Sequence, residues 1–70
     1  MTNRTYQGVV VAISNDFIKV EYTARGKKRT TVLSKVYYDY ESRTYKTAGD
    51  ILNYVIEFDD INCKIRKIIN

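Results

Sequence analysis

The side chains that usually carry out catalysis are scarce in this sequence of 70 residues. It has no histidine and a single cysteine, and no nucleophile lies at a spacing from a base that indicates a catalytic pair. Asp59 and Asp60 are adjacent carboxylates, but such residues at a turn usually hydrogen-bond the local backbone, so we expect them to shape the turn. Cys63 lies in an apolar pattern that predicts a small buried core residue. We therefore expect a protein that is not an enzyme and has neither a cofactor nor a metal site.

A dense group of cations points to binding instead. Most residues from 25 to 29 are basic, and the whole chain carries a formal net charge of +4. Such a group can neutralise several phosphates, which gives salt-dependent binding to a polyanion. The alternative is a hairpin tip whose long charged side chains are merely solvated. The predicted phosphate-binding residues are Arg25, Lys27, Lys28 and Arg29.

Tyrosines and cations are interleaved in the middle of the chain, where Tyr37, Tyr38, Tyr40 and Tyr45 lie. Bases stack on aromatic rings while cations meet phosphates, and this combination is typical of proteins that bind single-stranded nucleic acid. The alternatives are tyrosines that fill the end of a barrel and a protein interface with tyrosine and arginine anchors. From this segment and the last strand, the predicted binding residues are Lys35, Tyr37, Tyr38, Arg43, Tyr45, Lys46, Lys64 and Arg66.

The elements that must position these residues are predicted to be β-strands. Thr5–Ser14 is rich in β-branched and aromatic residues, and Phe17–Thr23 alternates apolar with polar residues. Lys28–Ser34 resumes β character after a turn at Gly26. Gly8 inside the first strand indicates a bulge or a sharp bend, as a long strand shared by two neighbours requires.

Two more strands are predicted in the second half of the chain. Ile51–Asp59 is the fourth, and Cys63–Ile69 is the fifth, with an irregular apolar spacing that indicates a bulge or a frayed end. Residues 35–48 lose the period of two, so we expect a short helix or a turn there. The apolar face of the fourth strand is predicted to consist of Leu52, Tyr54, Ile56 and Phe58.

Five strands that begin as a meander and end as a hairpin predict an all-β fold, a small five-stranded barrel of the OB type formed by a single domain, residues 1–70. An SH3-like barrel is the alternative, and the long connection after the third strand favours the OB arrangement. No apolar run approaches the roughly 20 residues of a membrane helix, and Met1–Tyr6 lacks the layout of a signal peptide. We therefore expect a cytoplasmic protein that does not enter a membrane.

Several of these segments together resemble a known family. Gln7–Val10, Phe17–Tyr22 with the following Gly26 turn, and Gly49–Leu52 are similar to the corresponding parts of bacterial translation initiation factor one, a single OB domain of about this length. The resemblance covers nearly the whole chain in pattern and implies an OB barrel that contacts ribosomal RNA. The sequence departs from the family in the connection after the third strand, where the family has a basic helical segment and this chain has tyrosines with two acids.

These observations predict a protein of the initiation-factor-one type that binds RNA or single-stranded nucleic acid, with the ribosome as its expected site of action. The alternative is a small barrel of the kind found in phages and prophages, whose partner is a host protein that it binds or inhibits.

Overall fold

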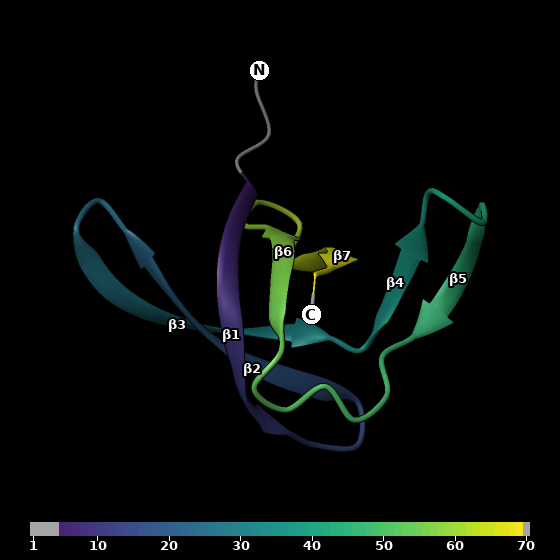
Figure 1. Cartoon of the computed structure of the whole chain (residues 1–70), viewed down its shortest axis with the longest axis horizontal. Coiled ribbons are helices and arrows are strands. Elements are labelled where there is room, and N and C mark those ends of the chain that lie inside the picture. Colours follow the sequence, from purple (N-terminus) through teal and green to yellow (C-terminus); the bar gives the residue numbers. More distant parts are fainter. Residues whose placement is uncertain (1–4, 70) are drawn as a thin grey trace.

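The computed structural model describes residues 5–69, and these residues form an all-β structure (Figure 1). No helix occurs within that range, which confirms the predicted fold class. Within the same range, no helix has the length and apolar character needed to cross a membrane. The strands are β1 (Thr5–Ile13), β2 (Phe17–Ala24), β3 (Lys27–Ser34), β4 (Val36–Asp39), β5 (Thr44–Thr47), β6 (Val55–Asp59) and β7 (Lys64–Ile68).

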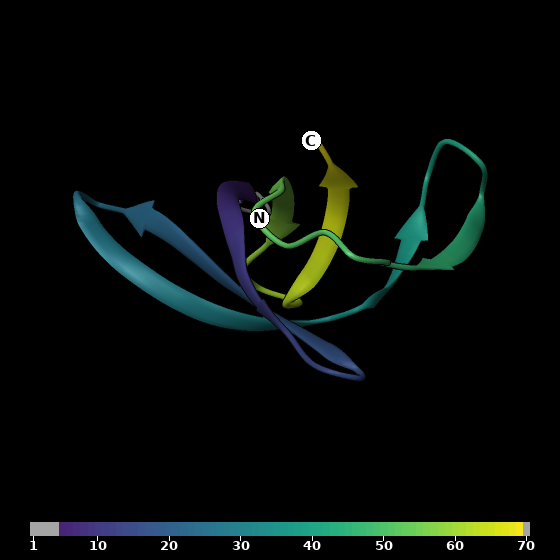
Figure 2. The ribbon, with the colours of Figure 1, turned by 60° about the horizontal axis from the view of Figure 1, so that its bottom comes forward.

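Five of the strands close into a barrel in the order β1-β2-β3-β7-β6, with β6 pairing back onto β1. Neighbouring strands are antiparallel except β3 and β7, which run parallel and meet at Ser34 and Lys64. Counted along the barrel alone, the order is first, second, third, fifth and fourth, which is the OB arrangement rather than the SH3-like alternative. Parallel neighbours require a crossover. The crossover from β3 to β7 consists of the β4–β5 hairpin, which stands outside the barrel, followed by β6 (Figures 1 and 2).

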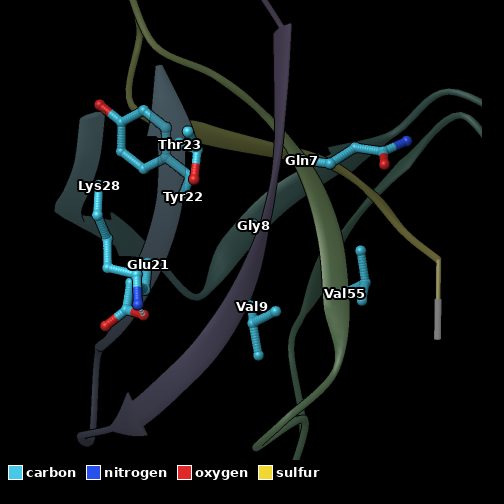
Figure 3. Close-up of a pocket in the computed structure, with 8 residues that line it drawn as sticks. All are labelled: Gln7, Gly8, Val9, Glu21, Tyr22, Thr23, Lys28 and Val55. Carbon is cyan, nitrogen blue, oxygen red and sulfur yellow. Dashed lines mark ion pairs between the residues drawn. The ribbon is translucent and has the colours of Figure 1, made fainter. Parts of the chain in front are cut away.

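β1 is shared by two neighbours, as predicted, and Gly8 lies where it pairs with both β2 and β6. A Cβ atom at position 8 would lie 2.5 Å from Cγ1 of Val20 and 2.9 Å from the backbone oxygen of Glu21, so the close approach of β1 and β2 requires glycine (Figure 3). The bulge in β1 occurs at Val11 rather than at Gly8. Gly8 therefore does mark a structural constraint in β1, but the constraint is close contact with β2 and not a bulge.

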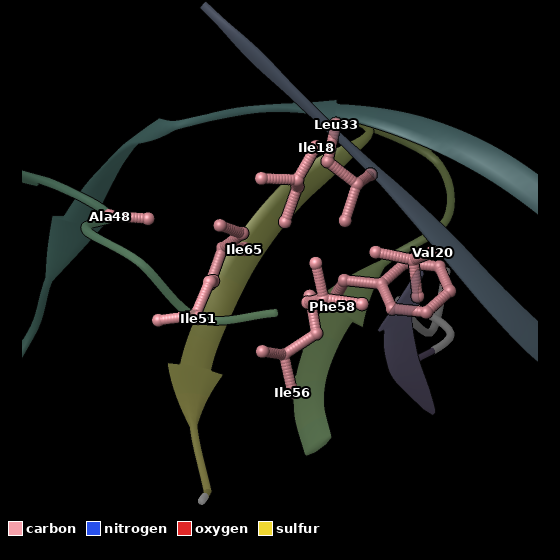
Figure 4. Close-up of a cluster of buried hydrophobic side chains, with 9 residues drawn as sticks. Ile18, Val20, Leu33, Ala48, Ile51, Ile56, Phe58 and Ile65 are labelled. Atoms are coloured by element: carbon pink, nitrogen blue, oxygen red, sulfur yellow. The ribbon is translucent and has the colours of Figure 1, made fainter. Parts of the chain in front are cut away.

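The interior of the barrel is filled by side chains from all five barrel strands and from the loop before β6 (Figure 4). The rings of Tyr6 and Tyr22 pack against fully buried Phe58, with centroids 6.2 Å and 5.0 Å from it, and seal one end. Burying a large apolar side chain contributes about 1.5–3 kcal/mol, so this cluster is the main source of stability. Its buried members are Val10, Ile18, Val20, Leu33, Ala48, Ile51, Ile56, Phe58 and Ile65.

The fourth barrel strand, β6, is shorter than predicted, because it begins at Val55 rather than at Ile51. Asn53 has a φ of 68°, and the N–H of Tyr54 donates to the carbonyl of Ile51 at 2.9 Å, so the chain turns before the strand starts. Leu52 and Tyr54 were predicted to face the core, but they are exposed, whereas Ile51 is buried. The apparent alternation of apolar residues includes both turn and strand residues. Only residues within a strand alternate between its two faces, so the pattern does not predict which turn residues are buried.

The connection after β3 is a β-hairpin, not the short helix or irregular turn predicted for residues 35–48. β4 and β5 pair antiparallel, with Tyr38 opposite Tyr45. Each strand has only four residues, and the turn at residues 40–43 separates them, which explains why the sequence shows no long period of two. Tyrosine, threonine and valine favour strands over helices, so the local composition agrees with the hairpin.

The β4–β5 and β6–β7 hairpins use the same turn chemistry. The carboxylates of Asp39 and Asp59 each accept a hydrogen bond from the backbone N–H two residues later, at 3.1 Å and 2.9 Å respectively. Each turn ends at a residue with positive φ, Arg43 at 56° and Cys63 at 53°. The turn role predicted for Asp59 is confirmed.

Cys63 is exposed, so the prediction of a buried core residue is wrong. It is the last residue of the turn, and β7 begins only at Lys64. Its Sγ lies 3.7 Å from the carbonyl oxygen of Asp60 within the same turn. The inward residue at this end of the chain is Ile65, which is 2% exposed.

The irregular apolar spacing near the C-terminus does mark a bulge, as predicted. Glu57 pairs with Lys67 and Phe58 pairs with Ile65, so Arg66 is an extra residue on β7. A bulge changes the direction in which a side chain leaves its strand. Arg66 is the residue whose direction changes here.

Candidate nucleic-acid interface

Three tyrosines, Tyr38, Tyr40 and Tyr45, meet at the β4–β5 hairpin, and we call them the tyrosine cluster. The ring of Tyr38 lies edge-on to both neighbours, with centroids 4.9 Å from Tyr40 and 5.2 Å from Tyr45 and interplanar angles of 77° and 74°. Aromatic pairs prefer such tilted arrangements, so the three rings hold one another in place. Tyr40 and Tyr45 are still 65% and 68% exposed, which leaves most of their ring surface open to a ligand.

Two cations from β7 border the tyrosine cluster. Arg66, at the bulge, lies over the ring of Tyr40 with its Cζ atom 5.5 Å from the centroid, within range of a cation–π interaction. Lys64 and the three tyrosines line an open hollow of about 670 Å³. A smaller hollow of about 110 Å³ beside it is lined by residues that include Arg66 and Asp59. The other residues around the larger hollow are Ser34, Val36, Tyr37 and Asn62.

Lys46 lies on the face of the hairpin opposite to Tyr38 and Tyr45, and its charge is neutralised by Asp39. Its Nζ is 2.9 Å from Oδ2 of Asp39, which also accepts a hydrogen bond from Oγ of Ser42 at 2.8 Å. The hydrogen bonds from Lys46 and Ser42 lower the pKa of Asp39 from 3.8 to about 2. In turn, the hydrogen bond to Asp39 raises the pKa of Lys46. Lys46 therefore braces the hairpin.

Asp59 holds the turn at the other side of the larger hollow, and its side chain is only 5% exposed. Burial by itself raises the pKa of this carboxyl group, but hydrogen bonds from the backbone N–H of Ile61 and from the side chain and backbone of Asn62 outweigh it, so the pKa is lowered. Nδ2 of Asn62 donates to Oδ2 of Asp59 at 3.0 Å. Asp59 thereby fixes Asn62 at the edge of the hollow.

The structure brings together one part of the predicted set of binding residues and separates the rest. Lys35 lines a different hollow, beside Val11 and Leu52, and Arg43 ends the β4–β5 turn as an exposed residue. Tyr37 lines the larger hollow but also packs against the core, as the barrel-filling alternative predicted. The predicted residues that surround the two hollows are Tyr37, Tyr38, Tyr45, Lys64 and Arg66.

The residues of this surface that were not among the predicted binding residues include Tyr40 and Asn62. Tyr40 lies in the tyrosine-rich segment, and its place beside tyrosines was a usable signal. Asn62 comes from the β6–β7 turn, and no pattern in the sequence connects that turn with the tyrosines. Only the folded barrel brings β4 beside β7.

The basic residues of the β2–β3 hairpin do not join this surface. Figures 1 and 2 show the tip of that hairpin and the β4–β5 hairpin at opposite ends of the molecule. Nζ of Lys28 lies 3.2 Å from Oε1 of Glu21 on the outer face of the barrel (Figure 3). Arg25, Lys27 and Arg29 are exposed, and no carboxylate within residues 5–69 pairs with them. The cation cluster predicted from the sequence is therefore a second, separate surface.

No group of metal-ligating side chains that could hold an ion occurs in the part of the chain that the structure describes. No family model, curated protein or solved structure matches this chain. The resemblance to initiation factor one therefore stays a prediction, and a function has to be inferred from the chemistry of the surface.

Proposed function

We propose that the protein binds single-stranded nucleic acid, with RNA as the expected form, on the tyrosine cluster. The observation that carries this proposal is the set of exposed rings with cations beside them. Arg66 lies over Tyr40, and Lys64 shares the hollow with the rings. Bases stack on the open faces of Tyr40 and Tyr45, and the phosphates between them meet the two cations.

The expected binding is tolerant of sequence. Every base has a face that can stack on an aromatic ring, and a stacked base contributes roughly 1–3 kcal/mol. Asn62 is the neutral polar side chain of the turn at the edge of the larger hollow, and it supplies hydrogen-bonding atoms there. A modest preference among bases would arise from this residue, because single-stranded RNA exposes base edges to such side chains.

The proposed setting is the ribosome, in the manner of initiation factor one. The OB strand order and the resemblance of the strand segments support this setting. In place of the basic helical segment of that family, the chain has the β4–β5 hairpin with its tyrosines. We infer that stacking replaces part of the charge contact made by that segment.

The test is the affinity for a fluorescently labelled eight-nucleotide oligouridine, measured by anisotropy. Tyr45→Ala removes a ring that is 68% exposed and should weaken binding by about 1–3 kcal/mol, which is roughly 5- to 150-fold. Tyr54→Ala is the matched control, because Tyr54 is 41% exposed and does not line either hollow beside the cluster. Equal losses in both variants, or no binding by the unaltered protein at low salt, would rule out the proposal.

A protein partner is the second candidate function, as for a phage- or prophage-type module that binds or inhibits a host protein. The observation that favours it is an open hollow of about 630 Å³ beside exposed Val11 and Leu52, on a different part of the barrel from the tyrosine cluster. A partner captured from nuclease-treated lysate by the unaltered protein and by Tyr45→Ala, but not by Leu52→Asp, would support this candidate. Capture that depends on Tyr45 would instead place a protein partner on the tyrosine cluster, as the interface alternative predicts, and would contradict the assignment of the partner to this hollow.

A further inference from the structure

The β2–β3 hairpin continues past its pairing with β1 as a two-stranded ribbon, which we call the basic ribbon, residues 23–29. Ala24 in this ribbon is still buried, and the exposed part begins at Arg25. The last residue of β2 that pairs with β1 is Tyr22, and β3 meets β7 only at Ser34. β2 and β3 remain paired with each other up to Ala24 and Lys27. At about 3.3 Å per residue, the ribbon extends roughly 10 Å past its last pairing with β1. Figures 1 and 2 show it leaving the barrel on the side away from β4–β5.

Cations occupy both faces and the tip of the basic ribbon. Lys27 and Arg29 are two residues apart and share one face, Lys28 lies on the other face, and Arg25 is at the tip. The residues from 25 to 30 are all exposed, and none of these cations is covered by the barrel. Among the ion pairs within residues 5–69, only Lys28 of this group has a carboxylate partner.

The turn at the tip retains a cation at a strained position. Arg25 has a φ of 53° and Gly26 a φ of 73°, which are the positive values that the central residues of a type I′ turn require. Glycine and asparagine are the usual residues there, and an arginine adopts this conformation at a cost in stability. Arg25 therefore places a positive charge at the tip, although this turn favours glycine or asparagine.

We propose that the basic ribbon enters a groove of a nucleic-acid duplex, so that the protein recognises a single strand at the point where it joins a duplex. This inference rests on the proposed function, which assigns the single strand to the tyrosine cluster. The major groove of B-DNA is about 12 Å wide and about 8.5 Å deep and admits a two-stranded β-ribbon, whereas the major groove of an RNA duplex is deep and narrow. We therefore expect a DNA duplex to be the better partner of the ribbon. A ribbon with cations on both faces meets phosphates on both walls of a groove. Lysine and arginine contacts of this kind add affinity without reading the base sequence.

The two surfaces are far enough apart to contact different parts of one nucleic acid. They lie at opposite ends of a molecule whose longest dimension is 34 Å, which corresponds to about ten base-pair steps at 3.4 Å per step. When one surface is bound, the other meets the same nucleic acid at a high effective concentration, so the combined affinity can exceed either one by roughly 100-fold or more. A single strand alone or a duplex alone uses only one surface.

The experiment compares three labelled probes by anisotropy: an eight-nucleotide single strand, a ten-base-pair hairpin stem, and the same stem with the single strand attached. Each probe is made as RNA and as DNA, which distinguishes the two sources of the duplex. The unaltered protein should bind the joined probe at least tenfold more tightly than the single strand. Lys27→Gln with Arg29→Gln should abolish this advantage, change the affinity for the single strand by less than twofold, and reduce the salt dependence of stem binding by about two phosphate contacts.

The matched control is Lys19→Gln with Lys67→Gln, which removes the same charge from two exposed strand residues outside the ribbon and should keep the advantage of the joined probe. Thermal unfolding of each variant shows that the barrel is intact. Equal affinity of the unaltered protein for the joined probe and the single strand would overturn the inference, as would equal losses in the two double variants. Competition by polyglutamate as strong as that by the stem would identify an acidic protein partner and also overturn it. Ribbon-dependent stem binding without binding of the single strand would contradict the proposed function but retain the assignment of the ribbon.

Discussion

The basic ribbon and the tyrosine cluster are two exposed surfaces with opposite construction. The ribbon carries cations without exposed aromatic rings and does not pair with β1 beyond Tyr22. The tyrosine cluster carries rings bordered by two cations, and its hairpin is tied to the barrel through Tyr37 and through β7. The first surface suits phosphates alone, and the second suits bases with their phosphates.

The comparison shows how differently sequence clustering and spatial clustering identify a surface. The ribbon cations lie within five residues of sequence, 25–29, yet alternation on β3 distributes them over two faces. The tyrosine surface combines residues from β4, the following turn, β5 and β7, and the bulge at Arg66 completes it. A group of cations that is close in sequence, as in the ribbon, is easy to find but does not indicate how the side chains are arranged. A surface built from several elements, as around the tyrosine cluster, is hard to find from the sequence but has a defined shape.

The largest expected effect concerns the barrel that both surfaces share. Phe58 is fully buried against Tyr22, the residue from which the ribbon departs. Phe58→Ala should lower the free energy of unfolding by about 3–5 kcal/mol, because it removes a core ring and leaves a cavity. Urea unfolding measures the loss. Phe17→Ala is the control, since Phe17 is 52% exposed, and a loss of similar size there would show that burial does not govern stability in this barrel.

A smaller effect should separate the two surfaces directly. Arg25 and Arg43 both have positive φ, one at the tip of the ribbon and the other in the β4–β5 turn. Asparagine tolerates this backbone conformation better than arginine does. Arg25→Asn and Arg43→Asn should each stabilise the protein by about 0.5–1 kcal/mol and raise Tm by a few degrees. Both substitutions remove one positive charge.

Only Arg25→Asn should weaken binding to the ten-base-pair stem. Stem affinity at two salt concentrations checks this, and the salt slope should fall by about one phosphate contact. If Arg43→Asn weakens stem binding equally, net charge rather than the ribbon determines the affinity for a duplex, and the distinction between the two surfaces disappears.

The barrel could be predicted from the sequence because its strands carry their own signals. The alternation of Ile18 and Val20 identified the inner face of β2, and the broken apolar spacing near Ile65 identified the bulge in β7. The strand order followed from the number of strands and the position of the long connection. These signals are local, and a strand with one buried face displays them directly.

The errors share one physical cause, which is that turns obey backbone conformation rather than periodicity. Positive φ at Asn53 ended an apparent strand, and positive φ at Cys63 accompanied an exposed side chain in a run that read as apolar. The β4–β5 hairpin was missed because its strands are short and Asp39 organises a turn between them. No sequence pattern relates Asn62 to the tyrosines, because that contact depends on how β7 closes the barrel.

The smallest expected effect concerns the ion pair that braces the tyrosine hairpin. The pKa of Asp39 is lowered from 3.8 to about 2, chiefly by the hydrogen bond from Lys46. A carboxyl group with a lowered pKa stabilises the fold above its ordinary pKa, and this contribution is lost as the pH falls from about 4 towards 2. The NMR signals of Tyr38 and Tyr45 should therefore shift in this range before the signals of the ribbon do. In Asp39→Asn this change in the tyrosine signals should be absent. A change in these signals that persists in the variant would be assigned to Asp59, whose pKa is also lowered. Simultaneous shifts in the hairpin and the ribbon would instead indicate that the whole barrel unfolds as one unit, without a separate contribution from the brace.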